Sequence, residues 1–145
     1  MTKLKLALLG RGKTGAKVID LVNQENELSK KTGFSIELST FHRQNPPTFD
    51  ALKDKDVILS FLPGGFFKEL IPLLIETKKP VVTGSTGFNW PSDVDNTLKT
   101  NKLTWVHGSN FALGMNLVKE MIEIMGKAAQ LFDQETSFSI HDIHH

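Results

Sequence analysis

The stretch KLKLALLGRGKTG, residues 3–15, decides the fold. An apolar run typical of a buried strand leads directly into Gly10, Gly12 and Gly15, which have the G-x-G-x-x-G spacing. In such a unit the first glycine permits a tight turn, the second lets the backbone approach a pyrophosphate, and the third lets helix and strand pack closely. The helix N-terminus then offers free N–H groups to the phosphates. We predict a dinucleotide-binding βαβ unit; the alternative is a glycine turn that binds nothing.

Apolar runs and helical patterns alternate along the next hundred residues. Further strands are expected at 34–41, 56–62, 80–84 and 103–108. Helices are expected at 13–29, 66–77 and 91–100. Because parallel strands need crossover helices, the predicted fold class is α/β, a Rossmann-like parallel sheet with helices on both faces.

Residues 115–132 carry an apolar stripe at helical spacing, and residues 136–143 read as one more strand. The stripe consists of Met115, Val118, Met121, Ile122, Met125, Ala129 and Phe132. We interpret it as a packing surface rather than a cofactor site. This chain either leaves it exposed or covers it with a partner chain.

Composition narrows the class of protein. A length of 145 residues suits one domain of ordinary size, and a net charge of +1 gives no basic excess for nucleic acid. Cysteine is absent, which excludes disulfides and thiolate metal sites. No run approaches the ~20 apolar residues of a membrane span, and the apolar start is too short for a signal peptide. We expect a soluble, cytoplasmic protein without nucleic-acid or membrane partners.

The end of the second expected strand indicates which dinucleotide binds. An NAD site usually has an acid there for the ribose 2′-OH, but this chain has TFHRQN at residues 40–45. Arg43 suits a 2′-phosphate instead, and Lys13 could add a second cation. NADPH is therefore the predicted cofactor, with NADH possible; the alternative is that Arg43 is a solvated loop residue.

Three loops that follow expected strands contain further candidate residues. Ligands of open parallel sheets bind beyond the carboxyl ends of the strands. The candidates there are Phe61, Leu62, Gly84, Thr86, Asn110 and Phe111. Each loop alone is an ordinary turn, but several at the same edge as a glycine loop favour a binding site.

Five segments resemble a known family in their order and spacing. They are GRGKTG (10–15), VILSFLPGG (57–65), VVTGSTGF (81–88), GSNFALGMN (108–116) and IHDIHH (140–145). The family is dihydrodipicolinate reductase, also called 4-hydroxy-tetrahydrodipicolinate reductase, and the resemblance covers essentially the whole chain. It implies an NAD(P)H-dependent oxidoreductase that reduces 4-hydroxy-tetrahydrodipicolinate to tetrahydrodipicolinate in lysine (diaminopimelate) biosynthesis. The family's enzymes have two domains and are usually homotetramers.

The resemblance also implies roles for individual residues. Pyrophosphate would lie at Gly10, Gly12 and Gly15, and the adenosine ribose or its 2′-phosphate at Arg43. The nicotinamide would contact Phe61, Leu62, Gly84 and Thr86, with Thr86 also near a substrate carboxylate. Asn110 and Phe111 would lie at the hinge beside the cofactor. Two segments that would contact the cofactor depart from the family's pattern. This chain has Lys13-Thr14 where the family often has Arg-Met, and Ser60-Phe61-Leu62 where the family often has Asp-Phe-Thr.

The last residues match the family's catalytic segment. His144 matches its proposed proton donor, and His145 matches a substrate-contacting histidine. A metal site built from His141, Asp142, His144 and His145 is the rival, but strand alternation puts His144 and His145 on opposite faces. A remnant of a purification tag is a weaker rival, since it would not explain SIHD before the pair. We expect no metal.

The expected domains are a dinucleotide-binding domain at 1–114 and the start of a substrate-binding and tetramerisation domain at 115–145. The family continues with a lysine and a Ser-Gly-Thr loop that hold the substrate's carboxylates, so we expect a truncated chain that is inactive alone. Two alternatives are a non-catalytic NADP(H)-binding sensor or interaction module, and another dehydrogenase family.

Overall fold

Five parallel strands form the sheet of this protein, whose computed structural model describes residues 2–29, 33–131, 139 and 141. The strands are β1 Thr2–Leu9, β2 Phe34–Phe41, β3 Val57–Ser60, β4 Val81–Thr83 and β5 Trp105–His107. Their order in the sheet is β2-β1-β3-β4-β5, with every pair parallel. The predicted Rossmann-like α/β sheet is thereby confirmed.

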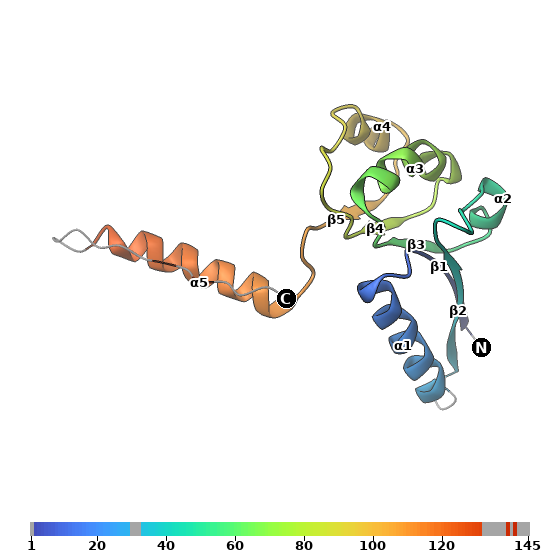
Figure 1. Cartoon of the computed structure of the whole chain (residues 1–145), viewed down its shortest axis with the longest axis horizontal. Helices are drawn as coiled ribbons and strands as arrows, with labels where there is room; N and C mark the ends of the chain where they lie inside the picture. Colours follow the sequence, from blue (N-terminus) through green and yellow to red (C-terminus); the bar gives the residue numbers. More distant parts are fainter. Residues whose placement is uncertain (1, 30–32, 132–138, 140, 142–145) are drawn as a thin grey trace. The chain divides into compact units, whose positions relative to one another are not determined.

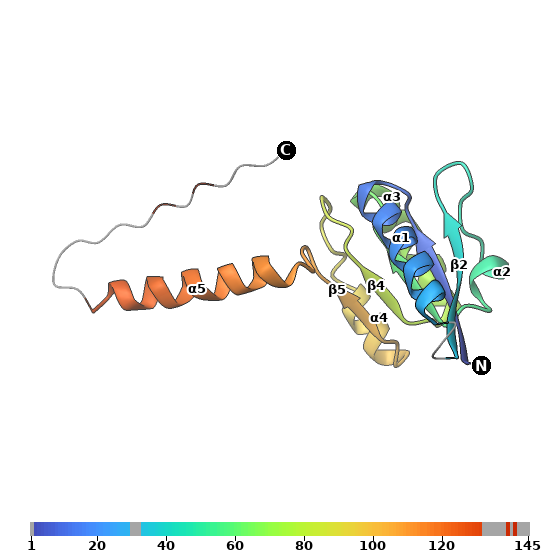
Figure 2. The same cartoon turned by 90° about the horizontal axis from the view of Figure 1, so that it is seen from below.

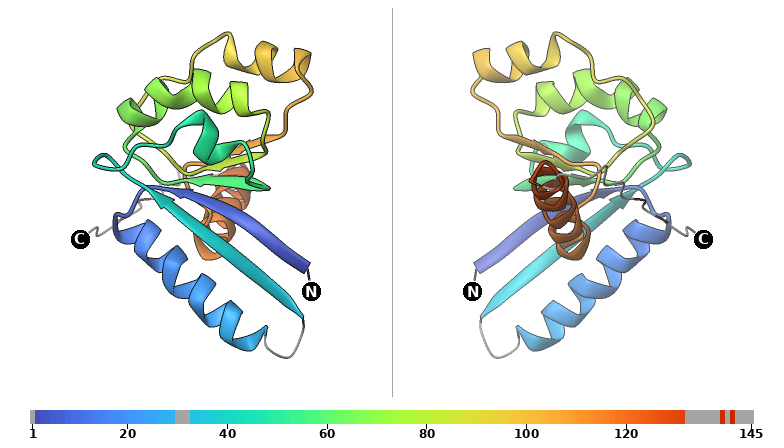
Figure 3. Two further views of the ribbon diagram at one scale, coloured as in Figure 1. Left: turned by 90° about the vertical axis from the view of Figure 1, so that its right-hand side faces the viewer. Right: turned by 90° about the vertical axis from the view of Figure 1, so that its left-hand side faces the viewer.

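The helices of the sheet unit lie on both of its faces. They are α1 Lys13–Leu28, α2 Phe49–Leu52, α3 Gly64–Thr77 and α4 Val94–Thr100. Figures 1 and 3 show α1 on one face and the other three on the opposite face, and Figure 2 looks onto the face that α1 covers. The chain runs from β1 to β2 on one side of β1, then returns to β3 on the other side. The sheet therefore reverses its direction of growth between β1 and β3, where open α/β sheets bind their ligands.

The strands end level with one another. A single row of the hydrogen-bond register contains Leu9, Phe41, Ser60, Thr83 and His107. The ladder continues one residue further, since the Gly10 N–H donates to the Phe41 carbonyl at 2.8 Å and the Phe61 N–H to the Leu9 carbonyl at 2.8 Å. The loops that follow these strands therefore begin side by side at one edge of the sheet.

Alternation along β1 supplies a core on each face. Ala7 and Leu9 point to the side of α3, whereas Leu6 and Leu8 point to the side of α1 and Val22. The larger cluster joins Ile58 and Val81 of the sheet to Phe67, Ile71 and Leu74 of α3 and to Val94 and Leu98 of α4. The buried face of α3 thus fixes its position over β1, β3 and β4.

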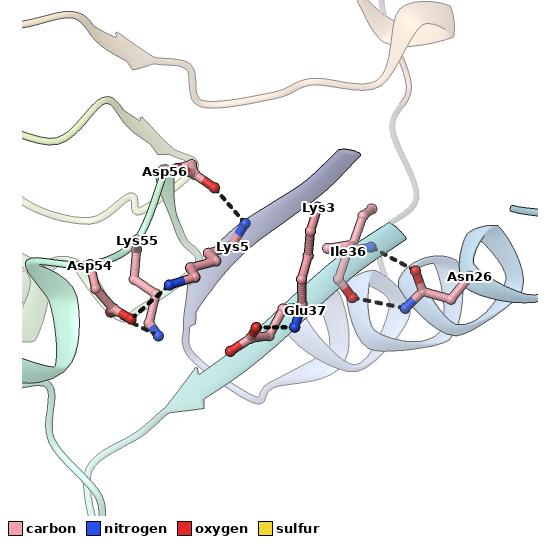
Figure 4. A network of polar contacts seen from close by, with 8 residues as sticks. All are labelled: Lys3, Lys5, Asn26, Ile36, Glu37, Asp54, Lys55 and Asp56. Carbon is pink, nitrogen blue, oxygen red and sulfur yellow. Dashed lines mark hydrogen bonds and ion pairs between the residues drawn. The ribbon is translucent and has the colours of Figure 1, made fainter. Parts of the chain in front are cut away.

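Polar contacts fix the first halves of β1 and β2, as Figure 4 shows. The Asn26 side chain of α1 both donates to and accepts from the backbone of Ile36, at 2.9 and 2.7 Å. Lys3 forms an ion pair with Glu37 at 2.6 Å, and this hydrogen bond lowers the pKa of the Glu37 carboxyl. The Lys5 N–H donates to Asp56 at 2.7 Å. These bonds tie α1 to β2 and tie β1 to the start of β3.

One short helix is not predicted by the apolar pattern of the sequence. Helix α2 has four residues, too few for a hydrophobic period, and its sequence signal is the cap instead. The Thr48 hydroxyl accepts the Ala51 N–H at 3.3 Å, as an N-cap threonine does.

The chain divides into two compact units, Met1–Ser109 and Asn110–His145. The second contains α5 Leu113–Ala129, which confirms the predicted helix and begins two residues earlier than its apolar stripe. The Asn110 side chain accepts the Ala112 N–H at 2.8 Å just before the helix, and no residue of α5 is buried. The predicted domain boundary after residue 114 stays a prediction, and the strand expected at 136–143 lies outside the described residues except for 139 and 141.

No helix in the described part of the chain is long and apolar enough to span a membrane.

Substitution of Phe67 provides a test of the core packing. Its side chain is fully buried, and its ring lies 5.7 Å from that of Phe88 and 6.4 Å from that of Trp105. We expect Phe67→Ala to lower the free energy of unfolding by about 3–5 kcal/mol, measured by urea titration followed by circular dichroism. Phe49→Ala is the matched control because Phe49 is 38% exposed, and its loss should stay below about 1 kcal/mol. Similar losses in both variants would contradict this description of the core.

Candidate dinucleotide-binding site

A cavity of about 950 Å³ opens at the carboxyl ends of β1, β2 and β3. Its lining comes from the glycine turn, the turn after β2, the loop after β3 and the first turns of α3. The lining residues are Gly10, Arg11, Gly12, His42, Arg43, Gln44, Leu62, Pro63, Gly65, Phe66 and Glu69. The cavity therefore lies at the point where the sheet reverses its direction of growth.

The glycine turn is shaped by two close backbone approaches. Gly10 has a φ of +105°, and a Cβ atom there would lie 2.8 Å from the Phe61 carbonyl oxygen. A Cβ atom on Gly15 would lie 2.1 Å from the Gly10 carbonyl oxygen. At Gly12, in contrast, a Cβ atom would meet no atom within 4 Å. Gly10 and Gly15 are thus required by the fold, whereas Gly12 borders open space in the cavity.

Helix α1 begins at the cavity with its positive end. Gly12 is the N-cap residue and makes no side-chain capping bond, and the first turn contains no acid. Lys13 and Thr14 are exposed in that turn. Since the first N–H groups of a helix have no acceptor within it, this end of α1 suits an anion.

The turn after β2 presents Arg43 to the cavity. His42 and Asn45 exchange backbone hydrogen bonds at 3.0 and 2.9 Å, which closes the turn. The Gln44 N–H donates to His42 Nδ1 at 3.3 Å, so Arg43 and Gln44 form its tip. The turn contains no carboxylate, and Arg11 of the glycine turn adds a second guanidinium to the same cavity.

The loops after β3 and β4 are locked together. The Gly64 N–H donates to the Thr86 carbonyl at 3.1 Å. Beneath them, the hydroxyls of Ser60 and Ser85 lie 3.2 Å apart, and both residues are buried. The position of Thr86 is therefore set by the start of α3.

The residues predicted from the sequence are only partly brought together. The cavity is lined by Gly10, Gly12, Arg43 and Leu62, while other candidates lie in the same turns or in the loop after β4 without lining it: Lys13, Thr14, Gly15, Phe61, Gly84 and Thr86. Asn110 and Phe111 belong to the second unit. His144 and His145 lie outside the described residues. The roles assigned to all of these residues stay predictions.

Two charged lining residues were not predicted. Arg11 occupies a variable position of the glycine motif, and its signal is its place between two glycines of the turn. Glu69 lies on α3, and its signal is the spacing of four residues from Gly65, which puts both on one helix face.

Within the described residues, no group of three or more His, Asp or Glu side chains is placed to hold a metal ion. Of the histidines and the aspartate considered for such a site, only His141 is described, and it is exposed.

Comparison with known sequences confirms the resemblance seen in the motifs. No family model matches the chain. The chain is 32% identical over 149 residues to a 4-hydroxy-tetrahydrodipicolinate reductase of Clostridium botulinum (strain Eklund 17B / Type B), covering 98% of this chain and 56% of that protein. It is 25% identical to the reductase of the same name from Pelagibacter ubique (strain HTCC1062), covering 100% and 57%. The chain thus spans about half the length of the curated relatives that it matches.

Comparison with solved structures supports the fold. A homoserine dehydrogenase of S. aureus, in its crystal structure at pH 6.5, matches with a TM-score of 0.60 and 17% identity over 74% of this chain and 33% of that one. At that identity the likeness shows the Rossmann-like fold alone.

The glycine turn leads to a prediction about stability. Gly15→Ala should lower the free energy of unfolding by more than about 2 kcal/mol, because its Cβ atom would press on the backbone at Gly10. Gly12→Ala, the matched control, should cost about 1 kcal/mol or less, since it meets open space and only replaces one N-cap residue by a poorer one. Thermal and urea unfolding of both variants measures the difference. Equal losses would show that the close approach at Gly15 does not constrain the fold.

Proposed function

We propose that this chain binds NADPH and contributes the cofactor-binding part of an NAD(P)H-dependent oxidoreductase that reduces 4-hydroxy-tetrahydrodipicolinate to tetrahydrodipicolinate in lysine (diaminopimelate) biosynthesis. One observation carries the proposal. The chain is related to these reductases over 98% of its length, and its glycine turn borders a cavity at the point where the parallel sheet reverses its direction of growth. The size, position and charge of that cavity support a dinucleotide as its ligand.

The cofactor's phosphates would be held from two elements. The pyrophosphate would lie against Gly12 and the N-terminus of α1, where backbone N–H groups and Arg11 favour negative charge. The adenosine ribose would reach the turn after β2, where Arg43 can form a charge-assisted bond with a 2′-phosphate. The absence of a carboxylate from that turn supports NADPH over NADH.

The nicotinamide and the substrate would lie toward β4. When bound, the reduced nicotinamide supplies a hydride. Phe61, Leu62 and Gly84 would flank the ring, and Thr86 would approach both the ring and a substrate carboxylate. The lock between Gly64 and Thr86 supports this assignment, because it holds Thr86 beside the cofactor cavity without help from a ligand.

The remaining roles concern the second unit. Asn110 and Phe111 would lie at the hinge beside the cofactor. His144 would give a proton to the reduced substrate, a task suited to a histidine whose pKa lies near neutrality, and His145 would contact the substrate. Residues 115–145 would begin the substrate-binding domain, through which the protein would form a homo-oligomer, a tetramer in the reductase family. We propose a cytoplasmic protein with a small dicarboxylate substrate and without nucleic-acid or membrane partners; the net charge of +1 supports the lack of a nucleic-acid partner.

A non-catalytic NADP(H)-binding sensor or interaction module is the second candidate. This function would require only the cavity, whose described lining residues all lie within Met1–Ser109. Oxidation of NADPH that depends on added 4-hydroxy-tetrahydrodipicolinate would support the reductase. Tight NADPH binding without such turnover is expected from both candidates, because the chain is expected to be inactive alone.

Calorimetric titration with NADPH and NADH tests the proposed cofactor. The chain should bind NADPH more tightly than NADH. Arg43→Ala should weaken NADPH by roughly ten- to a hundredfold, because a hydrogen bond between charged groups is lost, and should leave NADH within about threefold. Arg11→Ala is the matched control: this arginine would face the pyrophosphate, which both cofactors contain, so both affinities should fall by a similar factor.

The outcomes separate the two parts of the proposal. Equal losses of NADPH and NADH affinity in Arg43→Ala would remove the 2′-phosphate role from Arg43 and leave dinucleotide binding intact. Failure of the unaltered chain to bind either cofactor would contradict the proposed function itself.

A further inference from the structure

Glu69 has no role in the proposed phosphate contacts, although it lines the same cavity. It is the one carboxylate among the described lining residues, in a cavity with two guanidinium groups. It reaches the cavity together with Gly65 and Phe66 from the first two turns of α3. Residues three and four positions apart lie on one helix face, so α3 presents an aromatic ring and a carboxylate side by side.

The Glu69 carboxylate forms no ion pair with the neighbouring residues of its helix. The positions three and four residues away are Gly65, Phe66, Pro72 and Leu73, none of which carries a positive charge. Acids on other helices do have such partners, as Asp20 has in Lys17 and Glu123 in Lys119. In the described part of the chain, no hydrogen bond or ion pair to Glu69 occurs, and Glu69 is exposed. Its acceptor oxygens are therefore available to a ligand.

The remaining lining residues describe a site for a planar base. If the pyrophosphate lies at Gly12 and the ribose at Arg43, the base attached to that ribose must use the part of the cavity that these contacts leave free. Among the lining residues of the loop after β3 and of α3 that the other contacts leave free, Pro63 and Phe66 are apolar and Glu69 is charged. An apolar surface with one acceptor beside it suits an aromatic heterocycle that carries a hydrogen-bond donor.

We propose that Glu69 selects adenine as the base of the bound dinucleotide by accepting a hydrogen bond from the amino group at C6, while Phe66 packs on the ring. This inference rests on the proposed function, since it requires the cavity to hold a dinucleotide. Adenine presents a donor at C6, whereas hypoxanthine and guanine present a carbonyl oxygen there. A carboxylate that faces that oxygen would leave two acceptors opposed, and the hydrogen bond that adenine makes would be lost.

Another role for Glu69 gives a different result. A carboxylate can also accept hydrogen bonds from the ribose hydroxyls, which would replace the acid that the turn after β2 lacks and favour NADH. That role depends on the 2′ substituent of the ribose and not on the base, so the two roles respond to different analogues.

The test is calorimetric titration of the full 145-residue chain with NADPH, with NADH and with the analogue of NADPH in which hypoxanthine replaces adenine. The unaltered chain should bind NADPH roughly tenfold or more tightly than the hypoxanthine analogue, as expected for a charged hydrogen bond. Glu69→Gln should bring the two affinities within about threefold, because an amide can donate to the carbonyl oxygen as well as accept from the amino group. Glu76→Gln is the matched control, since Glu76 is an exposed acid of α3 that does not line the cavity, and it should keep the original ratio.

Each other outcome overturns the inference in a recognisable way. Equal binding of NADPH and the hypoxanthine analogue by the unaltered chain would refute base selection and leave the proposed function standing. An unchanged ratio in Glu69→Gln would assign the selection to another group. A loss confined to NADH in Glu69→Gln would assign Glu69 to the ribose instead. No binding of any dinucleotide to the unaltered chain would remove the proposed function and this inference with it. Urea unfolding of each variant checks that the fold is retained.

Discussion

The parallel register that aligns the ends of β1, β2 and β3 is the constraint on which the whole site depends. Leu9 pairs with Phe41 on one side and with Ser60 on the other, so Gly10 turns away directly beside Phe61. A slip of one residue in either pairing would send the apolar side chains of β1 to the wrong faces. It would also move the Phe61 carbonyl away from Gly10 and separate the three loops that now share a cavity. The hydrophobic pattern that folds the sheet therefore also positions its ligand site.

Helix α3 connects the core to the site. Phe67, Ile71 and Leu74 bury one face against the sheet and α4, while Phe66 and Glu69 of the same helix line the cavity. Packing thus fixes the cavity face of α3, because a rotation of the helix would expose Phe67. The hydrogen bond from Gly64 to Thr86 extends this order to the loop after β4. The loops after β3 and β4, both proposed to contact the cofactor, are consequently held in place through α3 and the core.

Local patterns in the sequence predict most of the fold and part of the site. Alternating apolar residues predict β2 with the bounds that the structure has, and the glycine spacing predicts the turn at Gly10. Helix α2 was not predicted, because four residues are too few to show a hydrophobic period. Glu69 and Arg11 were not predicted as cavity residues, because their place in the cavity depends on how distant segments pack, which no local pattern contains. The catalytic role of the histidine pair is predicted only by family resemblance, and the pair lies outside the described residues.

The separation of charges in the cavity follows from the different elements that carry them. Arg43 comes from the turn after β2 and Glu69 from α3, and no ion pair joins them in the described structure. An acid beside Arg43 in the same turn would neutralise it and compete with an anionic ligand. An acid on another element leaves the guanidinium free, since solvent and salt screen the interaction between separated exposed charges. A cavity can therefore combine an anion-binding end with an acceptor for a neutral donor, provided that the fold keeps the two apart.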